Sequence, residues 1–261
     1  MSLNPLWDIT FALFISITTY WYWRSDKKGV ISNFRQILFY FGMFLLAIVL
    51  VGPIPRQAII YFYVHMIQHI LIMMLISPLI ILGSPIKLIL SQSNATAKFF
   101  KKISKLEIIR SLFKPQIGFA IFLIALITTH FSPLANAAMN NSNLHCLELM
   151  IFLLAGVIYY YPVMEGNPHP YFVPHPVRVG SLFAMMLPET MTGFFLYSGN
   201  TLLHTAHNHN HMSMSKMLDP LRDQHIGGAL MWSMGMIIDS MWIALAARDW
   251  WASEKLKSGD I

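Results

Sequence analysis

The sequence predicts an all-α membrane protein, a bundle of seven transmembrane helices that forms a single domain over residues 1–261. Hydrophobic residues make up 56% of the chain and charged residues only 11%, a balance typical of polytopic membrane proteins. Long apolar runs alternate with polar connections, and each run is about long enough to cross a ~30 Å hydrocarbon core. The basic residues, which give a net charge of +6, lie mainly in the connections. We therefore expect them to contact the lipid bilayer and set topology, and we expect no nucleic-acid partner.

The seven apolar runs are the predicted spans. They cover residues 5–22, 34–51, 58–82, 116–130, 143–161, 179–197 and 225–247. The first ends in the aromatic residues 21–23 followed by Arg24, so we expect it to remain in the mature protein instead of being cleaved as a signal peptide. The fourth is the shortest. The sixth contains Pro188, which can bend a helix, and the seventh begins near Gly227-Gly228, which favours close helix contact.

Lysine and arginine residues predict the orientation. Fifteen of the eighteen lie after spans one, three and five or in the C-terminal tail, and only Arg56, Lys216 and Arg222 lie on the other side. The positive-inside rule therefore places the N-terminus outside and the C-terminus in the cytoplasm. The richest connection, residues 84–115, is predicted as a cytoplasmic loop that carries a helix on the inner membrane surface.

This orientation puts nine of the eleven histidines on the outer side. His65 and His69 lie four residues apart in span three, so their imidazoles share one helix face and can converge on one metal ion. Polar side chains also join membrane helices by hydrogen bonds, but ionisable residues inside a membrane usually mark functional sites. We favour metal binding, with His130 at the end of span four and His225 at the start of span seven as further ligands.

His145 and Glu148 form a second pair, three residues apart at the start of span five. A carboxylate beside an imidazole either binds the metal or accepts the second N–H of a metal-bound histidine. Glu148 can instead be an acid favoured by the helix dipole. Cys146 points about 100° away from His145 on a helix, so we expect it to pack in the bundle.

The outer connection of residues 201–224 is rich in histidine and methionine. Imidazole binds copper in either oxidation state and thioether sulfur favours Cu(I), so this composition predicts a mobile tether that captures copper. The auxiliary candidate ligands are His204, His207, His209, His211, Met212 and Met214.

Two acids lie inside predicted spans. Glu189 follows Pro188 in span six, and Asp239 lies deep in span seven. Each can serve as a proton or ion relay, or can pair with a polar group across the bundle. The sequence leaves both readings open.

Several of these motifs together resemble the CtaG family of caa3-type cytochrome c oxidase assembly factors. The resemblance covers roughly residues 40–247. It rests on His65-Met-Ile-Gln-His69, Ser77-Pro78, Leu82-Gly-Ser-Pro85, Thr129-His130-Phe-Ser-Pro133, His145-Cys-Leu-Glu148 and Asp223-Gln-His-Ile-Gly-Gly-Ala-Leu-Met-Trp232. It implies a seven-span bacterial membrane protein that matures haem-copper oxidase by handling copper. The family positions that it matches are His65, His69, His130, His145 and Glu148, whereas His225 and the histidines of residues 204–211 rest on their chemistry alone.

The sequence therefore predicts a copper-binding assembly factor of the bacterial inner membrane rather than an enzyme. It would hold Cu(I) or Cu(II) at the outer face and exchange it with cytochrome c oxidase subunits or an extracytoplasmic copper chaperone. Two alternatives stay open. Two histidines on facing helices can ligate haem iron, which would make a membrane electron carrier. Glu189 and Asp239 could instead serve a proton-coupled copper transporter.

Overall fold

The structure is a computed structural model that describes residues 5–26, 29–92, 95–164, 173–203 and 218–258. Every regular element in these ranges is a helix, which confirms the predicted all-α class. A helix forms at each of the seven predicted apolar runs. These helices are α1 (Pro5–Ser25), α2 (Asn33–Leu50), α4 (Phe62–Ile70) with its continuations η1 (Leu71–Ile76) and α5 (Ser77–Leu82), α9 (Pro115–Phe131), α11 (Ser142–Val163), α12 (His175–Ser198) and α13 (Pro220–Ser258).

Five helical segments of the described chain are long and apolar enough to cross a membrane. They are Asn33–Ala58, Phe62–Ser91, Ser142–Val163, His175–Ser198 and Pro220–Ser258. Helix α9 has 17 residues and so rises only about 25 Å. Helix α1 has 21 residues, but its Asp, Thr, Trp and Tyr residues lower its hydropathy. The structure is thus that of a multi-pass membrane protein with at least these five candidate spans.

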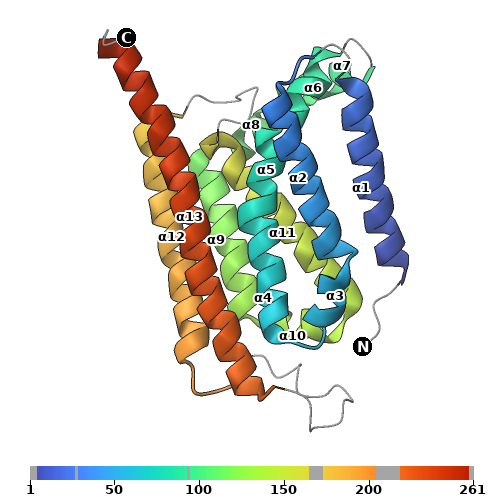
Figure 1. Cartoon of the computed structure of the whole chain (residues 1–261), viewed down its shortest axis with the longest axis vertical. Helices are drawn as coiled ribbons and strands as arrows, with labels where there is room; N and C mark the ends of the chain where they lie inside the picture. The colour runs from blue at the N-terminus through green and yellow to red at the C-terminus, as the bar shows by residue number, and fades with distance from the viewer. Residues whose placement is uncertain (1–4, 27–28, 93–94, 165–172, 204–217, 259–261) are drawn as a thin grey trace.

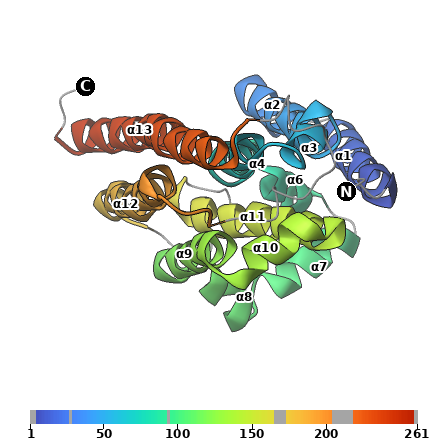
Figure 2. The same cartoon turned by 90° about the horizontal axis from the view of Figure 1, so that it is seen from below.

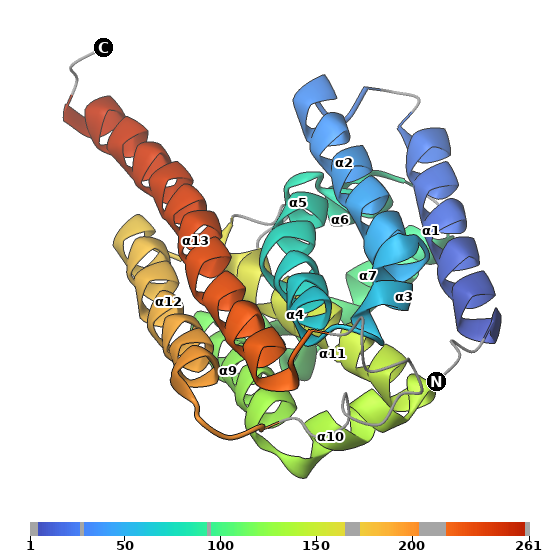
Figure 3. The ribbon, with the colours of Figure 1, turned by 60° about the horizontal axis from the view of Figure 1, so that its bottom comes forward.

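The helices form a bundle whose two ends differ (Figure 1). Short helices α6 (Pro85–Ser91), α7 (Ala95–Ile103) and α8 (Glu107–Leu112) lie at the end where α13 finishes. Helices α3 (Pro53–Ala58) and α10 (Pro133–Asn140) lie at the opposite end, with the start of α1. Seen from that end, α4 and α11 occupy the middle of the bundle, between α1 and α2 on one side and α12 and α13 on the other (Figure 2). Helices α12 and α13 pack along each other (Figure 3).

Two predicted segments differ in detail. The basic stretch of residues 84–115 forms three short helices instead of a single surface helix, because the backbone is extended at Gln92 and again at Leu106, just before Glu107. Helix α13 begins at Pro220 rather than near His225, since proline suits the first turn of a helix. Its last residues continue to Ser258, beyond the predicted end of the apolar run.

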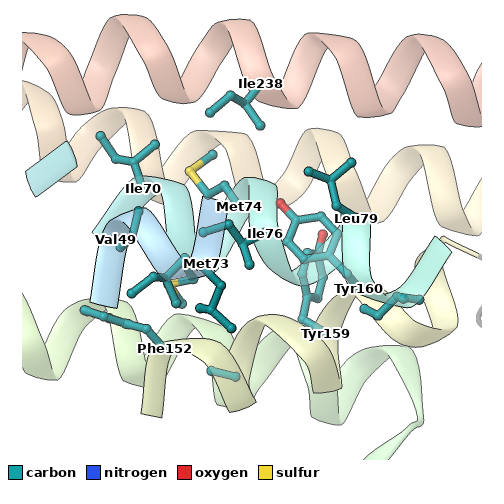
Figure 4. Close-up of a cluster of buried hydrophobic side chains, with 14 of the residues drawn as sticks. Val49, Ile70, Met73, Met74, Ile76, Leu79, Phe152, Tyr159, Tyr160 and Ile238 are labelled. Atoms are coloured by element: carbon teal, nitrogen blue, oxygen red, sulfur yellow. The ribbon is translucent and has the colours of Figure 1, made fainter. Parts of the chain in front are cut away.

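The third span is interrupted by a π-helical turn, η1. Pro78 has no N–H, so it cannot donate to the carbonyl oxygen of Met74, its α-helical partner. The indole Nε1 of Trp242 on α13 donates to that oxygen instead, at 2.8 Å. Around this turn, Met73, Met74 and Phe152 belong to the buried core that joins the third span to α11 and α13 (Figure 4).

Candidate metal centre

Four buried side chains from two helices converge at the end of the bundle where α4 and α11 begin. His65 and His69 come from α4, and His145 and Glu148 come from α11. One possible ligand atom from each lies within 4.8 Å of the other three. The structure therefore brings the two predicted pairs together in one group, which we call the His3Glu centre.

The distances in the His3Glu centre suit a metal ion better than direct hydrogen bonds. Oε2 of Glu148 lies 3.8 Å from Nε2 of His65 and 3.6 Å from Nε2 of His69. These separations exceed the usual N–H···O range of about 2.7–3.2 Å. Around a tetrahedral ion with bonds of about 2.0 Å, two ligand atoms are about 3.3 Å apart. The two measured separations are therefore close to those between ligands of one metal ion.

Unsatisfied polar atoms point to the same conclusion. Within the described residues, neither ring nitrogen of His69 has a hydrogen-bond partner, and neither does Oε2 of Glu148. Buried polar atoms are normally paired, because an unmade hydrogen bond costs about 1–3 kcal/mol. A bound metal ion would satisfy these atoms, so the donor set fits a metal.

Contacts from two other helices fix α4. The carboxylate of Asp223 on α13 accepts the backbone N–H groups of Phe62 and Tyr63 at 2.8 and 3.0 Å, so it caps the helix that carries His65 and His69. Nε2 of Gln68 donates to the carbonyl of Val49 on α2 at 2.8 Å. These bonds set the position and rotation of the histidine face. No sequence pattern predicted the role of Asp223, because its partners lie about 160 residues away.

Helix α11 is fixed at its start and packed closely further along. The side chain of Asn141 caps it by accepting the N–H of Asn143 at 2.9 Å. Nε1 of Trp7 on α1 donates to Oδ1 of Asn143 at 2.7 Å. Gly156 allows the close approach to the third span, since a Cβ at this position would lie 2.7 Å from the carbonyl oxygen of Met73.

His130 lies beside the His3Glu centre but is not one of its four members. Its ring centroid is 5.7 Å from that of His69. Its Nδ1 lies 2.8 Å from the carbonyl oxygen of Leu126, so Nδ1 donates and Nε2 keeps its lone pair. That Nε2 is buried and has no hydrogen-bond partner in the described chain.

Among the remaining predicted ligands, His225 lies in the described residues and is not a member of the His3Glu centre. Nε2 of His225 lies 2.8 Å from the carbonyl of Gly199, because this face of α13 turns toward the end of α12. Cys146 is buried, as a packing role requires. The auxiliary ligands His204, His207, His209, His211, Met212 and Met214 lie outside the described residues.

Comparison with known families identifies the chain. Residues 17–253 match the family model described as cytochrome c oxidase caa3 assembly factor (Caa3_CtaG). The protein belongs to this CtaG family. The match confirms the resemblance found in the motifs, and it places the chain among assembly factors rather than enzymes.

Three curated proteins of mycobacteria, each named as an uncharacterized protein, are similar to this chain. One from Mycobacterium leprae is 27% identical over 180 residues, which cover 66% of this chain and 27% of the relative. Others from Mycobacterium bovis and Mycobacterium tuberculosis are each 25% identical over 197 residues, covering 72% of this chain and 30% of the relative. The chain therefore spans less than a third of the length of these relatives. No solved structure matches it.

Proposed function

We propose that this protein holds copper in the His3Glu centre and passes it to haem-copper cytochrome c oxidase during assembly. The observation that carries the proposal is the convergence of four buried donor groups, from two helices, within 4.8 Å. Because the protein belongs to a family of cytochrome c oxidase assembly factors, the oxidase is the expected recipient of the metal.

The chemistry of the donors supports copper as the cargo. Imidazole suits copper and zinc, whereas calcium and magnesium prefer oxygen ligands. Three imidazoles and one carboxylate form the centre, and the chain adds a histidine- and methionine-rich segment at residues 204–214 that favours capture of Cu(I). The carboxylate of Glu148 would offset the charge of the ion in this buried site.

The geometry favours a bare ion over haem. A haem held by two imidazoles lies between them. The ring centroid of His65 is 4.0 Å from that of His69 and 4.8 Å from that of His145, so these rings contact one another and leave no space for a porphyrin.

The same proposal includes seven spans and an outward-facing site in the inner membrane of a bacterium. The basic helix α7, Arg110 of α8 and the basic end of α13 lie at one end of the bundle (Figure 1), and the positive-inside rule makes this end cytoplasmic. The His3Glu centre lies toward the opposite end, where α4 and α11 begin. Copper exchange with an oxidase subunit or an extracytoplasmic copper chaperone would therefore take place at the outer face.

The test of this function is the copper content of the oxidase purified from cells that carry variants of this protein. Glu148→Gln keeps the shape of the side chain and removes its charge, so we expect the oxidase to lose at least half of its copper while its haem is retained. Glu107→Gln, a matched change at an exposed acid on α8, should leave the copper content unchanged. Equal copper in the oxidase from both variants would refute delivery through this centre.

A further inference from the structure

A small cavity lies next to the His3Glu centre, deeper in the bundle. It measures about 20 Å³, which exceeds the roughly 10–15 Å³ that one water-sized sphere occupies. His69 lines it and thereby joins it to the His3Glu centre. Its other lining residues include His130, Glu189 and the four methionines Met66, Met73, Met74 and Met231. Such a concentration of thioethers around one cavity is what a soft metal ion prefers.

His130 lines this cavity, and its hydrogen bond leaves one ring nitrogen able to bind a metal ion. The bond from Nδ1 to the carbonyl of Leu126 fixes the tautomer and the orientation of the ring, as outer-shell partners do for metal-bound histidines. Nε2 is left with a lone pair and without a hydrogen-bond partner in the described part of the chain. The His3Glu centre does not use this nitrogen.

Glu189 supplies charge at the cavity. It is 2% exposed, and no N–H or hydroxyl group of the described residues donates to either of its oxygens. The carboxyl group of Asp239 on α13 is its neighbour, and two buried carboxyl groups that share one site do not both ionise. The pair then carries a single negative charge, which a monovalent cation would neutralise.

The methionines come from two sides of the cavity. Met73 lies in the π-helical turn of the third span, and Met231 lies on α13. Both side chains are buried, at 3% and 5% exposure. Figure 4 shows Met73 and Met74 in this turn, with Phe152 of α11 near Met73. A cation in the cavity would therefore meet thioethers from two helices and the imidazole of a third, α9.

We propose that this cavity is a second metal position, which binds one Cu(I) ion through Nε2 of His130 and the thioether sulfurs of Met73 and Met231, with Glu189 balancing its charge. The choice of copper rests on the proposed function, whereas the ligand set follows from the cavity itself. The position would store a second ion beside the His3Glu centre, since His69 borders both.

The test is the stoichiometry and coordination of Cu(I) bound by the full-length protein, purified without a histidine tag. We expect two Cu(I) ions in the wild type and a copper–sulfur shell in X-ray absorption. The double variant Met73→Leu, Met231→Leu conserves volume and should bind one ion without sulfur. Met43→Leu changes a buried methionine of α2 outside the cavity and should behave as the wild type.

Two further variants make the outcome unambiguous. His130→Gln should also remove one ion, which provides a second route if the leucine variant does not fold. A variant with His65→Ala and His145→Ala should lose the ion of the His3Glu centre and keep the sulfur-bound ion. A wild type without a copper–sulfur shell, or a leucine variant that binds copper as Met43→Leu does, overturns the second position whatever happens at the His3Glu centre.

Discussion

Trp242 makes a hydrogen bond that the backbone of the third span cannot make for itself. The proline at position 78 removes the α-helical donor for the carbonyl of Met74, and the indole of Trp242 replaces it at 2.8 Å. Trp242 is 2% exposed, so water cannot take over this role. A single side chain thus joins α13 to the helix that carries two of the candidate metal ligands.

We expect Trp242→Phe to destabilise the protein by about 1–3 kcal/mol, because a buried carbonyl loses its donor. The midpoint of thermal unfolding in detergent should fall accordingly. Trp251→Phe is the matched control, since Trp251 is 68% exposed and its replacement should change stability by only about 0.5 kcal/mol. Equal midpoints for the two variants would show that the bond to Met74 contributes nothing measurable.

The spacing along the sequence predicted which residues share a helix face, but not which helices bring these faces together. Residues four or three apart share a helix face, so the pairs of His65 with His69 and of His145 with Glu148 could be predicted from the sequence. The two pairs meet because α11 packs against the third span. This packing could not be predicted from local sequence patterns. His225 was placed at the correct end, but the rotation of α13 directs it toward Gly199.

At the scale of elements, the length and apolar composition of the seven runs predicted them as helices, and each of them contains a helix. The positions where these helices are interrupted were harder to predict from the sequence. No sequence pattern predicted the π-helical turn, and the donor to its Met74 carbonyl comes from the distant Trp242. The 84–115 stretch has roughly helical spacing, yet extended backbone at Gln92 and at Leu106 divides it into short helices.

Some helix starts are fixed by residues of the helix itself, and others by residues from a distant part of the chain. Pro220 starts α13 by its own backbone geometry, and Asn141 caps α11 with its own side chain, so both starts are encoded locally. The start of α4 is capped by Asp223 from another helix. The position of the candidate ligands on α4 therefore depends on the packing of α13, and this dependence could not be predicted from the sequence.

On the scale of the whole molecule, the bundle has a basic end and an end that carries the His3Glu centre. If the basic end is cytoplasmic, Ser104→Cys, in a Cys146→Ser background, should react with a membrane-impermeant maleimide only after the cells are permeabilised. Thr201→Cys, an exposed position at the other end of the bundle, should react in intact cells. The reverse labelling pattern would place the metal centre at the cytoplasmic face and contradict delivery from outside.

The most direct test of the central claim is the copper bound to the purified protein when the His3Glu centre is removed. His65→Ala together with His145→Ala takes away two of its four donors, and neither residue lines the adjacent cavity. We predict that this variant inserts into the membrane normally and loses the copper ion bound by nitrogen and oxygen, measured by metal analysis and X-ray absorption. Wild-type copper content with unchanged coordination would contradict the account.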